Sequence, residues 1–146
     1  MIAKTVLIIE DDFIIALDYK WRLEKAGWKV VGPAATVQAA LRLIQTEPPT
    51  VALLDMHLCG QLVTPVAVAL KAQQIPFVVC SGADDIEVIG GPVFAGVVNV
   101  EKPVRDGYLQ RALEIAVKGF PRAGLRQGVH TAASRDNGSS PLAGDA

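Results

Sequence analysis

The chain has 146 residues, of which 51% are hydrophobic and 20% are charged, so it is long and apolar enough to form one compact domain. Its formal net charge of −1 argues against strongly electrostatic partners, and we expect no direct binding to nucleic acid or to a membrane surface. The N-terminus lacks a basic leader followed by a long apolar region, and no apolar stretch approaches the roughly 20 residues that cross a bilayer. Two cysteines, expected as reduced thiols, fit the cytoplasmic location that these features favour.

Five short segments are predicted to be strands. Four are apolar runs without polar alternation, at 6–9, 51–54, 77–80 and 97–100, and a further strand is expected at 29–32. Such runs, rich in β-branched residues, are typical of strands covered on both faces. Segments with helical periodicity lie between them, so strands and helices alternate along the chain. This order predicts an α/β domain with a parallel sheet and helices on both faces.

Helices are predicted in four of the segments that follow strands, at 13–26, 37–45, 65–74 and 105–118. The first begins after Asp12, a suitable N-cap residue, and the third after the N-cap candidate Thr64. The side chains of the first helix expected to point inward are Ile14, Ile15, Leu17 and Leu23. The segment 82–96 should hold the remaining helix, but Gly90-Gly91-Pro92 interrupts it, so we expect a short or irregular fourth helix.

The domain is expected to end at residue 118. From residue 119 the composition changes to Gly, Ser, Arg and Ala without apolar periodicity. The sequence therefore predicts a domain at 1–118 and a flexible C-terminal tail at 119–146. No output domain fits in such a tail, and no helix-turn-helix pattern or basic face follows Lys118, which makes a transcription factor the least favoured function.

Polar residues stand at the ends of the predicted strands, namely Glu10, Asp11, Asp55, Ser81 and Lys102. In a parallel sheet these ends meet at one edge, where ligands bind in this class of fold. Clustered carboxylates attract a divalent cation, and oxygen ligands without a His or Cys cluster favour Mg²⁺. A carboxylate beside Mg²⁺ can act as a nucleophile toward a phosphoryl group and form an aspartyl phosphate. Ser81 could then donate a hydrogen bond to one phosphoryl oxygen, and Lys102 could balance the charge of another.

Each of these residues also has a purely structural interpretation. Asp11 and Asp12 can cap the first helix, and for Asp12 capping is favoured over metal binding. In the same way, Glu10 can be a solvated strand end, Ser81 a turn residue and Lys102 a surface charge. Asp55 is explained least well in this way, because it follows a fully apolar run and no helix begins directly after it. The joint occurrence of all five residues favours the functional interpretation.

Four stretches carry a family resemblance, and they are Val6-Leu7-Ile8-Ile9-Glu10-Asp11-Asp12, Leu53-Leu54-Asp55-Met56, Ser81-Gly82 and Lys102-Pro103. Their order and spacing, over about residues 4–118, resemble the acidic pair, phosphoacceptor, switch hydroxyl and Lys-Pro pair of bacterial response-regulator receiver domains. The resemblance implies a flavodoxin-like, doubly wound sheet of five parallel strands in the order 2-1-3-4-5. It also implies that Asp55 accepts a phosphoryl group from a sensor histidine kinase and that the Lys102–Pro103 bond is cis. The implied ligands of Mg²⁺ are Glu10, Asp11, Asp55 and the backbone carbonyl of His57.

Further stretches are similar to a narrower group of stand-alone receivers common in alphaproteobacteria, and they are 31–34, 55–58, 65–67 and 75–78. Members of that group carry a Phe-Ala-Thr-Gly signature on the fourth strand and often work with HWE-type histidine kinases. This chain has Val79-Cys80-Ser81-Gly82 in the corresponding place, so two positions depart from the signature and Ser replaces Thr.

One departure from the family pattern bears on mechanism. Receivers typically have Tyr or Phe three residues before the lysine, and the ring swings inward when the phosphoryl group draws the hydroxyl residue across. That position is Asn99 in this chain. The usual aromatic switch cannot operate, so an activated state has to be read out by other means, such as reordering of the segment 82–96.

Three classes of function stay open. The favoured one is a single-domain response regulator, a phosphoacceptor and not an enzyme apart from self-catalysed phosphotransfer and autodephosphorylation. It would signal by contact with a downstream protein, or drain phosphoryl groups from a shared kinase. A phosphohydrolase usually needs a second acid two residues after its nucleophile, where this chain has His57. A degenerate receiver that binds partners without phosphate is supported by Asn99 and opposed by the retained acids and lysine. If the chain forms a homodimer, the last helix and the segment 82–96 are the expected contact surface.

Overall fold

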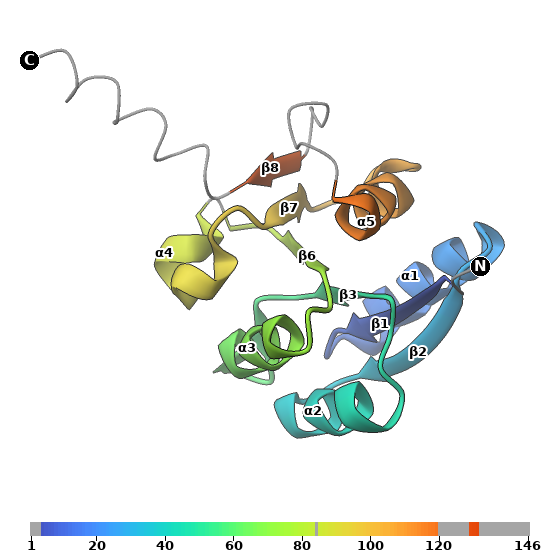
Figure 1. Cartoon of the computed structure of the whole chain (residues 1–146). Coiled ribbons are helices and arrows are strands. Elements are labelled where there is room, and N and C mark those ends of the chain that lie inside the picture. The colour runs from blue at the N-terminus through green and yellow to red at the C-terminus, as the bar shows by residue number, and fades with distance from the viewer. Residues whose placement is uncertain (1–3, 84, 120–128, 132–146) are drawn as a thin grey trace, which may run out of the picture.

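The centre of the fold is a six-stranded sheet (Figure 1), seen in a computed structural model that describes residues 4–83, 85–119 and 129–131. Across the sheet the strands are β2 (Lys29–Ala34), β1 (Thr5–Ile9), β3 (Val51–Leu54), β6 (Phe77–Ser81), β7 (Val98–Glu101) and β8 (Val129–Thr131). The first five of these are parallel to one another. They are the five predicted strands, and their order confirms the flavodoxin-like arrangement 2-1-3-4-5.

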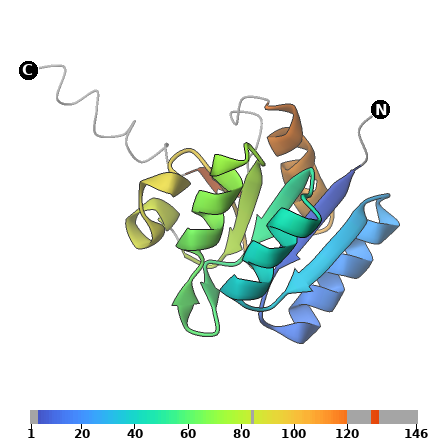
Figure 2. The same cartoon turned by 60° about the horizontal axis from the view of Figure 1, so that its bottom comes forward.

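Helices cover both faces of the sheet (Figures 1 and 2). Their bounds are α1 (Phe13–Lys25), α2 (Val37–Thr46), α3 (Thr64–Ala72), α4 (Ile86–Gly90) and α5 (Tyr108–Lys118). Helices α1 and α5 share one apolar core with the sheet, and α2, α3 and α4 share the other. This confirms the predicted layering. In the described ranges, none of the helices combines the length and the apolar character that a membrane span requires.

The orientation of α1 differs in part from the prediction. Asp12 caps the helix as predicted, because its Oδ1 accepts hydrogen bonds from the N–H groups of Ile14 and Ile15. The prediction that Ile14 and Leu17 point inward is wrong, since their side chains are 72% and 43% exposed. The buried positions are Ala16, Tyr19 and Leu23. Apolar residues lie on more than one face of this helix, so periodicity alone does not select the face that packs on the sheet.

Two predicted helix starts are displaced. Gly107 has a φ of 87°, which is outside the helical region, so α5 begins at Tyr108 and not at residue 105. The N-cap of α3 is Val63, and Thr64 is already helical. Its hydroxyl donates a hydrogen bond to the Gly90 carbonyl at 2.9 Å, so the residue expected to cap α3 instead ties α3 to the end of α4.

The fourth helix is short, as predicted. Helix α4 has five residues and is followed by a 3₁₀ turn at Pro92–Phe94. Its last residue, Gly90, packs so closely that a Cβ atom there would overlap the Phe94 ring and lie 2.9 Å from Met56 Cε. Because Met56 directly follows Asp55, this packing joins the end of α4 to the polar edge of the sheet.

A bulge in β2 sets the position of the first acidic residue. Leu7 pairs with Val31, but Ile9 pairs with Ala34, so β2 contains one extra residue between the two pairs. Gly32 has a φ of +90° in this bulge, and a Cβ atom there would lie 2.9 Å from the Ala34 nitrogen, which explains the glycine. The Ala34 carbonyl then accepts the Glu10 N–H at 3.0 Å and fixes the backbone at the end of β1.

The structure contains three strands that the sequence does not predict. Strands β4 (His57–Leu58) and β5 (Gln61–Leu62) form a small hairpin between β3 and α3. Strand β8 lies within the predicted tail and pairs antiparallel with β7. The rest of that tail, at 120–128 and 132–146, lies outside the described residues. Segments of two or three residues leave little periodicity to detect, which explains why sequence patterns miss them.

Candidate functional site

Strand register brings the predicted site residues to one edge of the sheet. Ile9 and Leu54 end β1 and β3 and are paired, so Glu10 and Asp55 are the next residues on neighbouring strands. The Asp55 N–H donates to the Ile9 carbonyl at 3.0 Å, which extends the pairing beyond the strands. Ser81 pairs with Glu101, which places Lys102 one residue beyond the end of β7. The Lys102–Pro103 bond is cis, as the resemblance implies.

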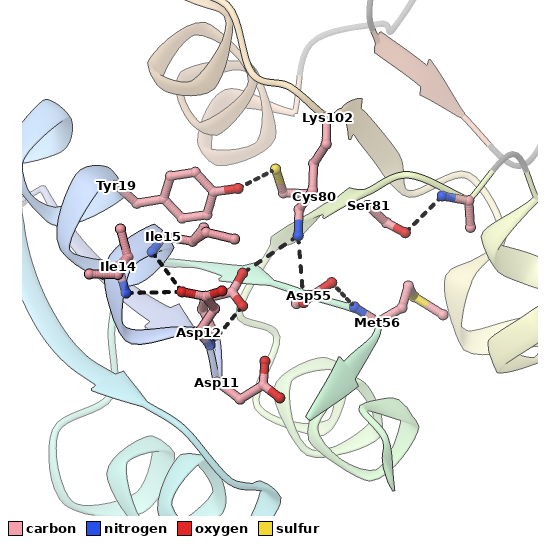
Figure 3. A network of polar contacts seen from close by, with 12 residues as sticks. Asp11, Asp12, Ile14, Ile15, Tyr19, Asp55, Met56, Cys80, Ser81 and Lys102 are labelled. Atoms are coloured by element: carbon pink, nitrogen blue, oxygen red, sulfur yellow. Dashed lines mark hydrogen bonds and ion pairs between the residues drawn. The ribbon is translucent and has the colours of Figure 1, made fainter. Parts of the chain in front are cut away.

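Four of the five predicted side chains meet at this edge (Figure 3). The ammonium nitrogen of Lys102 lies 3.6 Å from Asp55 Oδ2 and 3.7 Å from Glu10 Oε1, so one cation bridges two carboxylates. One oxygen from each of Glu10, Asp11 and Asp55 lies within 4.8 Å of the others. Three carboxylates therefore share a space that contains one ammonium group.

Burial makes Glu10 the most perturbed acid of the cluster. Its side chain is only 3% exposed, and desolvation together with the charge of Asp55 raises its pKa to about 7. The hydrogen bond from the Asp12 N–H to Oε2 and the charge of Lys102 oppose this rise. Oε1 is buried and has no hydrogen-bond partner among the described residues. Glu10 is therefore held at the edge with an oxygen directed toward the cluster and incompletely satisfied.

Two other groups of the cluster, Asp11 and Lys102, are stabilised in their ionised forms. The Cys59 N–H donates to Asp11 Oδ2 at 2.8 Å and lowers the pKa of Asp11. Burial disfavours the charge of Lys102, but the carboxylates of Asp55 and Glu10 outweigh it and hold the lysine pKa above its ordinary value. Asp55 Oδ1 accepts the Met56 N–H at 2.9 Å, which orients the carboxylate. At neutral pH the cluster consequently carries excess negative charge.

Ser81 and His57 are placed differently from the carboxylates. The Ser81 hydroxyl accepts a hydrogen bond from the Ala83 N–H at 3.0 Å, and Figure 3 shows its side chain directed away from Lys102. His57 lies in β4 with an exposed side chain. The participation of its backbone carbonyl in metal binding stays a prediction.

Sequence patterns do not show what Asn99 contacts. Its side chain is 2% exposed, and its Nδ2 donates to the Ala83 carbonyl at 2.8 Å. A buried amide in the middle of an apolar strand is the signal that marks the residue, since such a group needs a partner. Ala83 itself carries no signal, because it contributes only backbone groups.

The raised pKa of Glu10 predicts a specific loss of stability with increasing pH. Between the ordinary pKa of 4.5 and about 7, the unfolded chain releases the Glu10 proton and the folded chain keeps it, so the free energy of unfolding falls as pH rises. The shift corresponds to roughly 3 kcal/mol. Urea denaturation in a chelator at pH 5 and pH 8 should show this fall in the wild type and a smaller one in Glu10→Gln. Equal falls in both proteins would show that Glu10 is not the responsible group.

The cluster has the chemistry of a site for a hard divalent cation. Its donors are all oxygens, they come from three carboxylates, and one of them is the buried Glu10 Oε1, which has no hydrogen-bond partner among the described residues. Such donors suit Mg²⁺ or Ca²⁺ better than Zn²⁺, which prefers nitrogen and sulfur. The residues present therefore fit a magnesium site.

A scan against models of protein families gives no match, and neither does a search of curated proteins. Solved structures do match. A mutant of the anti-anti-sigma factor PhyR from Bartonella quintana has a TM-score of 0.68 and 26% identity, with coverage of 81% of this chain and 50% of that one. The response regulator PhyR from Brucella abortus has a TM-score of 0.67 and 27% identity, with coverage of 81% and 49%.

An isolated domain matches over nearly its whole length. The signal receiver domain of a modulated diguanylate cyclase from Desulfovibrio desulfuricans G20 has a TM-score of 0.68 and 26% identity, with coverage of 81% of this chain and 96% of that one. The chain thus spans about half the length of the two PhyR chains and nearly all of this domain. The chain therefore has the fold of response-regulator receiver domains, and its acidic cluster lies at the carboxyl ends of the strands.

Proposed function

We propose that this chain is a single-domain response regulator of a two-component phosphorelay, which accepts a phosphoryl group from a sensor histidine kinase on Asp55. The observation that supports the proposal best is the contact of Lys102 Nζ with both Asp55 and Glu10, beside a third carboxylate. A purely structural ion pair needs one acid for one lysine, whereas here two acids contact the lysine and a third carboxylate lies beside them. The surplus of negative charge at a partly exposed edge indicates a site for a cation, which would offset the repulsion of an incoming phosphoryl group.

Asp55 is the residue best placed to act as the nucleophile. Its carboxylate is oriented by the Met56 N–H and lies against the Lys102 ammonium. In the proposed transfer, an Asp55 oxygen attacks the phosphorus of a phosphohistidine. The P–N bond breaks, and its electron pair leaves with the imidazole of the kinase. Lys102 neutralises charge on the phosphoryl oxygens, and Ser81 donates a hydrogen bond to one of them after its side chain turns.

The proposed metal ligands are the carboxylates of Glu10, Asp11 and Asp55 together with the backbone carbonyl of His57. Bound Mg²⁺ supplies positive charge that offsets the repulsion between the carboxylates and the incoming phosphoryl group. Asp11 is held for this role by the Cys59 N–H, which keeps its carboxylate ionised at the rim of the cluster.

A phosphohydrolase is supported less well. The residue two positions after the proposed nucleophile is His57, which lies in a hairpin with an exposed side chain. A degenerate receiver that serves only as a binding scaffold has one observation in its favour, namely that the Ser81 hydroxyl is engaged with Ala83. The retained cluster of acids and lysine favours the phosphoacceptor over both alternatives.

The proposal extends to location and partners. We place the protein in the cytoplasm, where it would exchange phosphoryl groups with a sensor histidine kinase and signal by contact with a downstream protein, or act as a sink for the kinase. A homodimer would be compatible with this role. No direct contact with nucleic acid is proposed, in keeping with the net charge of −1.

The test is a phosphate-affinity gel of the purified protein after incubation with Mg²⁺ and acetyl phosphate. We expect a retarded band in the wild type and none in Asp55→Asn. Asp12→Asn is the matched control, because it removes a neighbouring acid whose observed role is to cap α1, and asparagine caps equally well. We expect Asp12→Asn to give the same retarded band as the wild type.

Two outcomes would contradict the proposal. A retarded band in Asp55→Asn would place the phosphoryl group on another residue. The absence of any band, with acetyl phosphate and with a panel of histidine kinases, would favour the scaffold.

A further inference from the structure

The turn that follows β6 is held by one side chain from β6 and one from β7, and both bind the backbone of Ala83. The Ala83 N–H donates to the Ser81 hydroxyl at 3.0 Å, and the Ala83 carbonyl accepts from Asn99 Nδ2 at 2.8 Å. Both backbone polar groups of Ala83 are thus bound by side chains, one from β6 and one from β7. Val79 pairs with Asn99 and Ser81 with Glu101, so Ser81 and Asn99 lie close together on neighbouring strands.

Asn99 and Ser81 point to the face of the sheet that α4 covers. Side chains alternate between faces along a strand. Val98 and Val100 belong to the core shared with α1 and α5, which leaves Asn99 on the opposite face, and Cys80 belongs to that same core, which leaves Ser81 beside Asn99. Ala83 lies two residues before Asp85, the N-cap of α4. The Asn99 hydrogen bond therefore holds the chain at the point where it enters α4.

The hydrogen bonds of Ser81 link this turn to the phosphoryl site. A hydroxyl that donates to a phosphoryl oxygen has to come within about 2.8 Å of it, whereas the Ser81 side chain now turns toward Ala83 and away from Lys102 (Figure 3). When Ser81 turns, either the Ala83 N–H follows it or this bond breaks. If the N–H follows, Ala83 is displaced relative to Asn99, and if the bond breaks, the turn loses one of the two side-chain hydrogen bonds that hold Ala83.

The Asn99 amide has an unused acceptor available to the displaced turn. Its Oδ1 is buried and has no hydrogen-bond partner among the described residues. A buried acceptor without a partner destabilises the arrangement that contains it. An N–H group of the moved turn that reached Oδ1 would relieve that penalty, so the residue can favour a second position of the turn as well as hold the first.

We infer that Asn99 is a positioning residue that couples Ser81 to α4: it holds the Ala83 carbonyl in the unphosphorylated state and releases it when Ser81 turns to the phosphoryl group. This inference rests on the proposed function of Asp55. It assigns to a hydrogen bond the part that a moving aromatic ring plays in typical receivers.

The experiment compares backbone hydrogen exchange in peptides that cover Ala83 and α4, in the full chain with Mg²⁺, before and after acetyl phosphate. Asn99→Leu removes the hydrogen bond and keeps the size of the side chain, and Asn99→Ala is a second variant in case leucine does not pack. Thr64→Val is the matched control. It removes a side-chain hydrogen bond at the opposite end of α4, to the Gly90 carbonyl, which has no link to Ser81.

We expect unphosphorylated Asn99→Leu to exchange roughly fivefold faster in these peptides than the wild type, the ratio typical for one lost hydrogen bond. Phosphorylation should accelerate exchange in the wild type and in Thr64→Val and should have little further effect in Asn99→Leu. A purely structural role of Asn99 would leave the response to phosphorylation intact.

Three results would overturn the inference. The first is unchanged exchange in both Asn99 variants without acetyl phosphate, which would show that Asn99 does not hold the turn. The second is a response to phosphorylation in the Asn99 variants as large as that of the wild type, which would show that it does not couple. The third is a wild type that no donor phosphorylates. In that case the proposed function fails and the coupling falls with it, while the unphosphorylated comparison still reports whether Asn99 holds the turn.

Discussion

Lys102→Met is expected to lower the rate of phosphorylation by acetyl phosphate roughly 10²-fold, the loss typical when one charge-stabilising donor is removed from a phosphoryl or oxyanion site. The ammonium is the only cationic group that the described residues bring into contact with Asp55 and Glu10. Without it, the negative phosphoryl donor meets uncompensated carboxylates. The measurement is the time course of the retarded band in a phosphate-affinity gel at fixed Mg²⁺.

The same substitution should strengthen the binding of Mg²⁺ to the unphosphorylated protein, because a competing positive charge has been removed. Calorimetric titration would detect this. Lys71→Met is a control in which an exposed lysine of α3 is changed in the same way, and both quantities should stay at wild-type values. A wild-type phosphorylation rate in Lys102→Met would show that this lysine is only a structural counter-ion.

Phe94→Ala is expected to lower the free energy of unfolding by about 3–5 kcal/mol, the usual cost of deleting a buried aromatic ring. The Phe94 ring is fully buried and packs edge-on against Phe77, with 6.0 Å between the ring centroids. It also fills the space directly above Gly90, so its removal leaves a cavity between α4, α3 and the sheet. Urea denaturation gives the difference directly.

Phe13→Ala is the matched control for this prediction, because it deletes the same ring from a side chain that is 67% exposed. Surface substitutions of this kind usually change stability by less than about 0.5 kcal/mol. Similar losses in the two variants would show that the packing of Phe94 contributes no more to stability than a surface contact.

The positions of Glu10, Asp55 and Lys102 can be predicted from sequence, because each follows an apolar strand and parallel strands end at the same edge. The contacts between them depend on register, which the β2 bulge at Gly32 and the pairing of Ile9 with Leu54 fix in three dimensions. Local sequence patterns show where each strand ends, but they do not show which residues of neighbouring strands pair. The fold and the membership of the acidic cluster were therefore predictable, whereas its distances were not.

The failures of prediction have a common physical origin. Residues Ile14 and Leu17 are apolar but exposed, because α1 has more apolar residues than one buried face accommodates. Asn99 was predicted only as a missing aromatic residue, since its partner is the backbone of Ala83, which no side-chain pattern marks. The first outcome depends on which face of α1 packs against the sheet, and the second depends on the position of a backbone group. Residue type alone determines neither of these.

The two outer strands of the sheet affect whether sheets of different molecules can associate. Strand β8 has only three residues, and β2 contains a bulge, an exposed Lys29 and a Pro33 that has no N–H to donate. A sheet grows from molecule to molecule only where an outer strand offers a straight, regular row of free N–H and C=O groups. Neither outer strand does so in the described residues. Crowded copies of this domain are therefore expected to resist edge-to-edge extension of the sheet of the kind that leads to fibres.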